Sequence, residues 1–170
     1  YRFRSNAIAR FAAVVQVIGA GFGRTGTVSL KLALETLLGG RRINKKKILN
    51  RRQDAPAWMA GFAGNDVDWA ELLAGWSAIV DWPGVACVNE LAKAFPDAKI
   101  LLSTRDPNSW WRSADRTILE LVRDVEPGSP SASFMAAMFE RSGVDAARAE
   151  ASIRAYVEHN DRIRSTYGPN

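Results

Sequence analysis

The sequence has very few of the residues from which disulfide frameworks and metal centres are built. Among its 170 residues there is one cysteine, Cys87, and one histidine, His159. A single cysteine excludes an intramolecular disulfide and a cysteine-based zinc site, and it fits a reducing compartment. A single histidine excludes a multi-histidine metal centre. We therefore expect a cytoplasmic protein that works without a metal ion and buries Cys87 in its core.

Long apolar runs are also missing. No run approaches the ~18 residues that a membrane-spanning helix requires, and no charged and then apolar secretory leader is visible. Hydrophobic residues make up 47% of the chain, which is enough for one core. We expect residues 1–12 to be a tag remnant or an irregular lead-in and residues 13–170 to form a single α/β domain.

Positive charge is unevenly distributed, although the net charge is +5. Ten of the 23 lysines and arginines lie in residues 1–12 and 41–52, which contain no acid, and acidic residues predominate in the rest. Nucleic-acid binding needs phosphate neutralisation over a broad surface, so we do not expect a nucleic-acid partner. The run at 41–52 is either a solvated loop or a basic rim that attracts an anionic ligand.

A glycine-rich stretch near the N-terminus organises the chain. The β-branched run at residues 14–18 predicts a buried parallel strand, and Gly19, Gly21 and Gly23 follow it. Apolar residues then recur at helical spacing from Thr25 onward. A strand, a glycine loop and the start of a helix together form an anion site, with phosphate or sulfate as the expected occupant.

Several interpretations of this loop remain open. A nucleoside-triphosphatase loop requires lysine after its last glycine, and here Thr27 follows Gly26. The stretch GFGRTG matches the dinucleotide fingerprint, but the acidic residue expected about 20 residues later is replaced by a basic run that suits a 2′-phosphate. Alternatively, Arg24 supplies a guanidinium within the loop, beside two hydroxyls and backbone N–H groups. A plain turn between strand and helix is the simplest alternative.

Two further predicted strands end in polar residues. Residues 77–80 end at Asp81, and residues 99–104 end at Arg105, so both side chains are expected where ligands bind in open α/β sheets. Asp81 could instead cap a helix over residues 84–95. Arg105 could instead pair with Asp106 or Asp115.

The remaining chain reads as helices. Asp54, Asp68 and Asp106 are expected to begin helices, and three more are predicted over residues 117–125, 131–141 and 145–167. Trp58, Phe62, Trp69 and Trp76 are expected mainly as core residues, some of them lining an acceptor cavity.

Three co-linear motifs carry a family resemblance. The stretches GFGRTGTVSLK at residues 21–31, VDWP at 80–83 and LSTRDPNSWWRS at 102–113 resemble the sulfotransferase family, specifically its microbial P-loop-like branch, in order and spacing. The similarity runs from about residue 14 to residue 164. It implies a three-layer P-loop-like α/β fold, with a short, mainly parallel central sheet between helices and a helical C-terminal half.

The resemblance also implies an enzyme that moves a sulfuryl group from 3′-phosphoadenylyl sulfate (PAPS) to a hydroxyl or amine of a small acceptor, with adenosine 3′,5′-bisphosphate as product. Matched residue by residue, its donor-binding positions are Gly23, Arg24, Thr25, Gly26, Thr27, Val28, Ser29, Arg105 and Ser113. The element at His159-Asn160 is similar to the family as well.

The chain departs from the family at two places. Asn44 stands where the family has a histidine, so no histidine role is carried over. The family also continues beyond the point matched by Asn170, and we expect this domain to lack that closing segment.

These observations assign the catalytic roles. Asp81 is expected to accept the proton of the acceptor, because His159 is predicted to lie on a distant C-terminal helix. Arg24 is expected to stabilise the sulfuryl oxygens and the leaving phosphate, with Lys31 as a second cation near Asp81. Arg24 and Arg105 would then hold opposite ends of one nucleotide. The alternatives are an NADP-type Rossmann oxidoreductase and an inactive nucleotide-binding or interaction module.

Overall fold

A short parallel sheet lies at the centre of the fold. The computed structural model describes residues 14–38 and 52–168. Its strands β1 (Val17–Gly19), β2 (Ala78–Val80) and β3 (Lys99–Leu101) pair in the order β2-β1-β3, all parallel. The predicted α/β class with a short, mainly parallel sheet is therefore confirmed. Because the strands are parallel, their carboxyl ends lie at one edge of the sheet, where ligand sites form.

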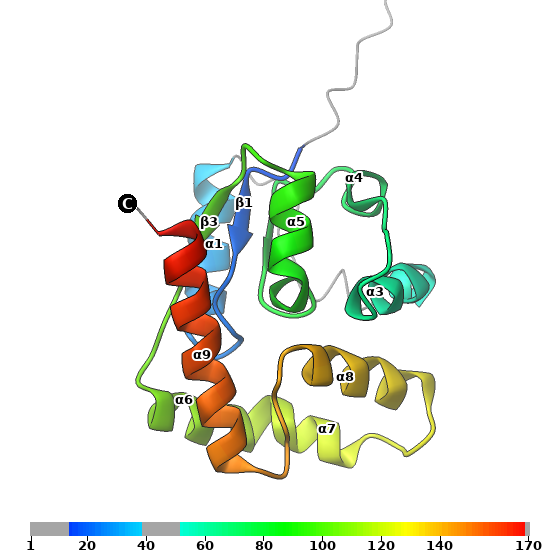
Figure 1. Cartoon of the computed structure of the whole chain (residues 1–170), viewed down its shortest axis with the longest axis vertical. Helices are drawn as coiled ribbons and strands as arrows, with labels where there is room; N and C mark the ends of the chain where they lie inside the picture. The colour runs from blue at the N-terminus through cyan, green and yellow to red at the C-terminus, as the bar shows by residue number, and fades with distance from the viewer. Residues whose placement is uncertain (1–13, 39–51, 169–170) are drawn as a thin grey trace, which may run out of the picture.

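Helices cover both sides of this sheet. The helix α1 (Thr27–Leu37) follows β1, while a 3₁₀ turn, η2 (Gly84–Cys87), and α5 (Val88–Ala94) connect β2 to β3. In Figure 1, α1 and α5 lie on opposite sides of β1. This arrangement gives the expected three layers and explains why β1 is buried on both faces.

The rest of the described chain is helical. Its elements are η1 (Arg52–Asp54), α3 (Ala55–Phe62), α4 (Trp69–Leu72), α6 (Pro107–Ala114), the π-helical segment η3 (Asp115–Leu119), α7 (Glu120–Asp124), α8 (Pro130–Arg141) and α9 (Ala149–Tyr167). In Figure 1, α6 and α7 follow one another beyond the carboxyl edge of the sheet, α8 turns back above α7, and α9 rises from α6 towards the sheet. None of the described helices is long and apolar enough to cross a bilayer.

Two of the three predicted capping residues act as expected. The Asp68 side chain accepts a hydrogen bond from the backbone N–H of Glu71 (2.9 Å), and Asp106 accepts one from Ser109 (2.8 Å). Asp54 holds the N-cap position of α3 but makes no side-chain cap bond there. Pro56 instead favours the first turn of α3. Backbone N–H groups in a first turn have no acceptor within the helix, so proline, which lacks an N–H, loses no hydrogen bond there.

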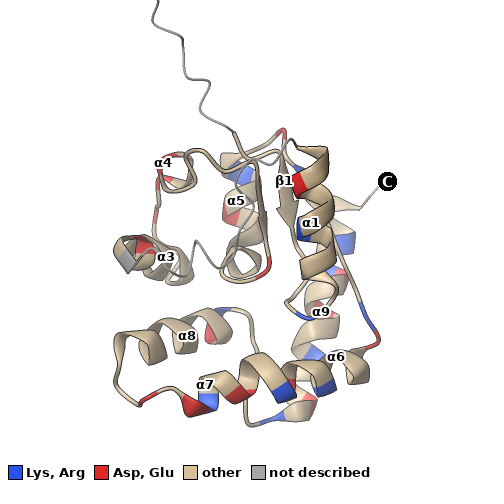
Figure 2. Cartoon of the chain, turned by 180° about the vertical axis from the view of Figure 1, so that it is seen from behind, with Lys and Arg blue, Asp and Glu red and all other residues tan. Residues whose placement is uncertain are grey.

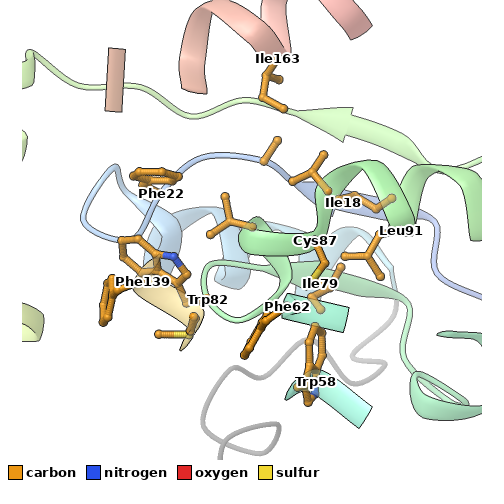
Figure 3. Close-up of a cluster of buried hydrophobic side chains, with 14 of the residues drawn as sticks. Ile18, Phe22, Trp58, Phe62, Ile79, Trp82, Cys87, Leu91, Phe139 and Ile163 are labelled. Carbon is orange, nitrogen blue, oxygen red and sulfur yellow. The ribbon is translucent and has the colours of Figure 1, made fainter. Parts of the chain in front are cut away.

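Aromatic residues dominate the core. The tryptophans expected there, Trp58, Trp69 and Trp76, are all buried, and so is Phe62. Cys87 is fully buried as well, and burial raises the pKa of its thiol to about 12, so it remains protonated core material. All of these residues belong to one hydrophobic cluster, and Figure 3 shows Trp58, Phe62 and Cys87 in it. Phe22 from the glycine loop contacts Trp82, which in turn contacts Phe139.

Several element boundaries differ from the predicted ones. The central strand β1 spans 17–19 rather than 14–18. The strand β3, which pairs with β1 alone among the described strands, ends at Leu101 rather than at 104. The helix predicted over 84–95 is divided into η2 and α5. The last helix begins at Ala149 rather than at 145, since the Ser152 hydroxyl bonds both backbone groups of Asp145 in a turn.

Other predictions lie outside the described residues. They are the lead-in at 1–12, the helix stop at Gly39-Gly40, nearly all of the basic run at 41–52, and Asn44.

Candidate active site

The glycine loop between β1 and α1 packs tightly against the ends of the other two strands. A Cβ atom on Gly21 would lie 2.3 Å from Ser103 Oγ after β3, and one on Gly23 would lie 2.6 Å from Asp81 Oδ1 after β2. Real Cβ atoms do not approach other atoms so closely, so both positions require glycine. The loop glycines thus allow the backbone to approach the carboxyl ends of both neighbouring strands.

Side-chain donors hold three carbonyl groups of this loop. Ala20 O accepts from the ring of His159 (2.7 Å), Phe22 O from the hydroxyl of Thr25 (2.7 Å), and Gly23 O from the indole of Trp110 (3.0 Å). The N–H groups in the first turn of α1 have no acceptor within their helix. With these three carbonyls bound to the protein, the loop can offer N–H groups and the positive helix end to an anion.

Asp81 is held beside this loop directly after β2. Its Oδ2 accepts a hydrogen bond from the Thr27 hydroxyl (2.9 Å), and its Oδ1 accepts one from the backbone N–H of Trp82 (2.7 Å). The helical segment that follows has Pro83, not Asp81, at its N-cap, so the structure does not support the helix-cap role for Asp81. The residue is 7% exposed and lines a cavity.

Backbone strain marks the same place. Among the described residues, the two non-glycine residues with positive φ are Arg24 (76°) and Asp81 (73°), and both line that cavity. Such conformations cost of order 1–3 kcal/mol and persist where the surroundings fix them, often at functional sites.

The cavity is large, and its lining has a polar part and an apolar part. Its volume is about 1280 Å³, with Asp81, Thr27, Arg24 and Arg105 among its polar lining residues. Apolar side chains from α3, η3, α7 and α8 supply much of its wall: Trp58, Ile118, Leu121, Phe134, Met135, Met138 and Phe139. Among the described residues of its wall, Asp81 supplies the single carboxylate, which faces a largely apolar space and suits a proton acceptor next to an apolar ligand.

A smaller cavity of about 460 Å³ adjoins it, and the two share Arg24, Arg105 and Thr117. Four arginines line the smaller cavity together with hydroxyl residues: Arg24, Arg105, Arg112, Arg116, Ser109, Ser113 and Thr117. None of the described residues that line it is acidic. Figure 2 shows basic residues along α6 and the helical segment after it.

Hydroxyl groups fix two of these guanidinium groups. Arg24 Nε donates to Ser113 Oγ (3.0 Å), and Arg112 Nη2 donates to Ser109 Oγ (2.8 Å). A serine leaves the guanidinium charge uncompensated, whereas a carboxylate would neutralise it. This chemistry is suited to a phosphate dianion, which guanidinium groups bind in bidentate geometry.

The predicted structural role of Arg105 is not observed. Asp106 caps α6, where the Ser109 N–H chiefly, and the nearby Arg112 and Arg105 charges to a smaller extent, hold its pKa below the usual value, and Asp115 pairs with Arg123. Arg105 instead faces both cavities.

Most of the predicted site residues lie together. Those that line one or both cavities are Gly23, Arg24, Gly26, Thr27, Val28, Asp81, Arg105 and Ser113. Thr25 is buried with its hydroxyl bonded to Phe22 O and Ser103 Oγ, and Ser29 lies exposed on α1 outside both linings. Both threonine hydroxyls of the loop are thus engaged with protein atoms.

Arg24 and Arg105 line the same two cavities. Two expectations about charge and position are corrected. Lys31 pairs with Glu35 on α1 (3.5 Å). His159 is not distant, because its ring bonds Ala20 O in the glycine loop and stacks on Phe22 with 4.3 Å between ring centroids.

Sequence reasoning also missed several residues of the site. Ser109, Arg112 and Arg116 join Ser113 on one face of α6 and η3, and their spacing of three and four residues was a readable signal. The long-range contacts of Trp110, Tyr156 and His159 had no such signal.

Comparisons with known proteins agree with this geometry. A family model described as the sulfotransferase domain matches residues 16–170. The Ava biosynthesis cluster protein M of Aspergillus versicolor is 29% identical over 119 residues, which cover 64% of this chain and 45% of that protein. The chain thus spans less than half the length of this curated relative.

Proposed function

We propose that this chain, which belongs to the sulfotransferase family, transfers a sulfuryl group from PAPS to a hydroxyl or amine of a small acceptor. One observation carries the proposal: an arginine-lined cavity, in which no described lining residue is acidic, adjoins a larger cavity that contains a carboxylate and apolar walls. The two cavities meet at the glycine loop through Arg24. A doubly anionic donor and an uncharged acceptor require such a pair of neighbouring sites.

The donor fits the polar side of this arrangement. PAPS carries a 3′-phosphate and a 5′-phosphosulfate, and the smaller cavity offers Arg105 and Ser113 to the first of these groups. The glycine loop and the start of α1 lie close by for the second, with Arg24 between them. Arg112 and Arg116 add positive charge that favours the dianion.

The acceptor fits the larger cavity. Phe134, Met138 and Phe139 offer aromatic and thioether surface to an apolar body, and Asp81 receives the reacting group. The name of the fungal relative places that protein in a biosynthesis cluster, which supports a small-molecule acceptor here as well.

The reaction follows from these positions. Asp81 takes the proton of the acceptor hydroxyl or amine as the acceptor atom attacks sulfur. A new bond to sulfur forms while the bond from sulfur to the 5′-phosphate oxygen breaks, and adenosine 3′,5′-bisphosphate leaves. Arg24 stabilises the negative charge on the sulfuryl oxygens and the leaving phosphate, so the proposed step uses no metal ion. The single buried cysteine supports action in the cytoplasm.

The family assignment favours this function over an NADP-type oxidoreductase. Both ligands carry an extra phosphate on ribose, so the arginine-lined cavity alone does not separate them. An inactive nucleotide-binding module would bind the bisphosphate without turning over the donor.

Calorimetric titration separates these possibilities. Adenosine 3′,5′-bisphosphate should bind more tightly than adenosine 5′-monophosphate and more tightly than NADPH. The 3′-phosphate contact should contribute about 1.5–3 kcal/mol, the range for hydrogen bonds to charged groups. Equal binding of the two adenosine nucleotides, or preference for NADPH, would contradict the proposal. Binding without sulfated product from any phenol, alcohol or amine in an acceptor panel would favour the inactive module.

A further inference from the structure

The helix α9 touches both of the segments that form the donor site. Tyr156 and His159 lie one helical turn apart on it, and both are buried. Tyr156 reaches the backbone of Arg105 after β3, and His159 reaches the glycine loop after β1. The two contacts therefore connect one rigid face of a helix to two separate anion-binding points.

Tyr156 holds Arg105 by its backbone. The phenol oxygen accepts from Arg105 N–H (2.8 Å) and donates to Arg105 O (3.0 Å). Its ring stacks on Trp110, with 4.5 Å between centroids and 7° between planes. Because the ring is fixed by stacking, the hydroxyl provides a fixed reference for the residue that carries the guanidinium. Arg105 itself is exposed, so surrounding side chains restrain its backbone less than that of a buried residue, and the two hydrogen bonds from Tyr156 matter more for its position.

His159 holds the loop in a similar way. A guanidinium can only donate hydrogen bonds, so the Arg162 contact to Nδ1 (3.1 Å) requires Nδ1 to accept and places the proton on Nε2. Nε2–H then donates to Ala20 O (2.7 Å). The ring also stacks on Phe22, so the loop is held by a hydrogen bond and by a ring contact.

We infer that Tyr156 and His159 are positioning residues of the donor site. Tyr156 places Arg105 for the 3′-phosphate, and His159 places the glycine loop for the 5′-phosphate. Together they fix the separation between the two phosphate-binding points, so that the site selects a nucleotide with both phosphates. The inference rests on the proposed function, since it assumes a donor that has both groups.

The inference predicts different effects for the two residues. Tyr156→Phe keeps the stacked ring and removes the hydroxyl, so only the 3′-phosphate contact should weaken. His159→Leu removes the donor to Ala20 O, so the 5′-phosphate contact should weaken for any adenosine nucleotide. A general loss of stability would lower both affinities in either variant and would not separate the two ligands.

The experiment is calorimetric titration with adenosine 3′,5′-bisphosphate and with adenosine 5′-monophosphate. We expect Tyr156→Phe to lower the affinity for the bisphosphate by about tenfold and to leave the affinity for the monophosphate within about twofold of the wild-type value. His159→Leu should lower the affinities for both nucleotides by a similar factor of about tenfold. His159→Gln, whose amide can still donate to Ala20 O, should retain most of the wild-type affinity for both. Circular dichroism and urea unfolding confirm that each variant is folded before titration.

A matched control lies on the same helix. Tyr167 donates its hydroxyl to Asn89 Oδ1 (2.9 Å), outside both cavity linings, so Tyr167→Phe should leave both affinities unchanged. The inference is wrong if Tyr156→Phe lowers the affinities for both nucleotides equally or leaves both unchanged. It is also wrong if Tyr167→Phe lowers the bisphosphate affinity as Tyr156→Phe does. If His159→Leu does not fold, a bisphosphate-specific loss in Tyr156→Phe still supports the inference and its absence still overturns it. If the wild type does not prefer the bisphosphate, the proposed function fails first and the inference fails with it.

Discussion

The two adjoining cavities differ in what holds their lining side chains. In the smaller one, guanidinium groups are held by serine hydroxyls and lined by no described acid, so their charge remains available to a ligand. In the larger one, the described lining contains one carboxylate, that of Asp81, which is bonded to Thr27 and to the backbone of Trp82, and much of the surrounding wall is apolar. The first arrangement suits tight binding of an anion, and the second suits a proton acceptor beside an uncharged ligand.

The comparison separates binding from chemistry. Substitutions in the smaller cavity should change donor affinity, and substitutions in the larger one should change turnover or acceptor recognition. Arg24 is assigned to the sulfuryl oxygens and the leaving phosphate, so its substitution should change both donor affinity and turnover. Arg105 lines both cavities as well, but it is assigned to the 3′-phosphate, so its substitution should change donor affinity alone.

The largest expected effect is that of Asp81→Asn on turnover. General-base catalysis contributes ~10²–10⁴-fold, so kcat should fall by that factor. Donor affinity should stay nearly constant, because Asp81 acts on the acceptor. The measurements are sulfated product formed per unit time and calorimetric donor affinity on the same preparation. Unchanged turnover would remove Asp81 from the mechanism, and lost donor binding would make its role structural.

The second effect concerns pH and the loop that both cavities share. Burial lowers the pKa of His159 from 6.5 to about 4, with the Arg162 charge acting in the same direction and the bond to Ala20 O opposing it. Between these values the unfolded chain binds a proton that the folded chain does not, so stability falls as pH is lowered from 6.5 to 4. The shift corresponds to about 3 kcal/mol.

Urea unfolding across this pH range measures the effect. His159→Gln has no titrating ring, so its free energy of unfolding should vary less with pH than that of the wild type. Equal pH profiles for the two proteins would show that the buried imidazole does not titrate in this way.

The third effect is that of Arg105→Ala on the donor. Loss of a charged hydrogen-bonding partner costs about 1.5–3 kcal/mol, so affinity for adenosine 3′,5′-bisphosphate should fall by roughly 10- to 150-fold. The KM of the acceptor should not change. Arg154→Ala, on the exposed surface of α9, is the matched control and should have no effect. A similar loss in both variants would point to overall charge instead of the smaller cavity.

The smallest effect is expected at the apolar wall. Phe134 lines the larger cavity and packs edge-on against Phe62, with 5.3 Å between ring centroids. A contact between the Phe134 ring and the ring of an aromatic acceptor would contribute about 0.5–1.5 kcal/mol to acceptor binding. Phe134→Leu should therefore raise the KM of such an acceptor by about two- to tenfold. Donor affinity should be unaffected. A changed donor affinity with an unchanged acceptor KM would reverse the assignment of the two cavities.

Local patterns were sufficient to predict the fold and part of the site. The apolar run before Gly19 and the strands that end near Asp81 and Arg105 fixed three parallel strands and the edge where ligands bind, because strand direction and burial leave a readable signature. Asp68 and Asp106 could be predicted as caps for the same reason: each signal lies within one helical turn.

The rest depended on contacts between distant segments. The bonds from Tyr156 to Arg105 and from His159 to Ala20 join residues 51 and 139 positions apart, and no local pattern indicates them. The positive φ of Asp81 is equally invisible in a sequence, and the loop at Gly23 that its carboxylate approaches is distant along the chain.

The most direct test is a crystal structure of this chain with adenosine 3′,5′-bisphosphate. We expect the 3′-phosphate in the smaller cavity on Arg105 and Ser113 and the 5′-phosphate at the glycine loop. The larger cavity beside Asp81 should stay open for an acceptor. A nucleotide bound in the reverse direction, or one that fills the apolar end of the larger cavity, would contradict the division between a donor site and an acceptor site.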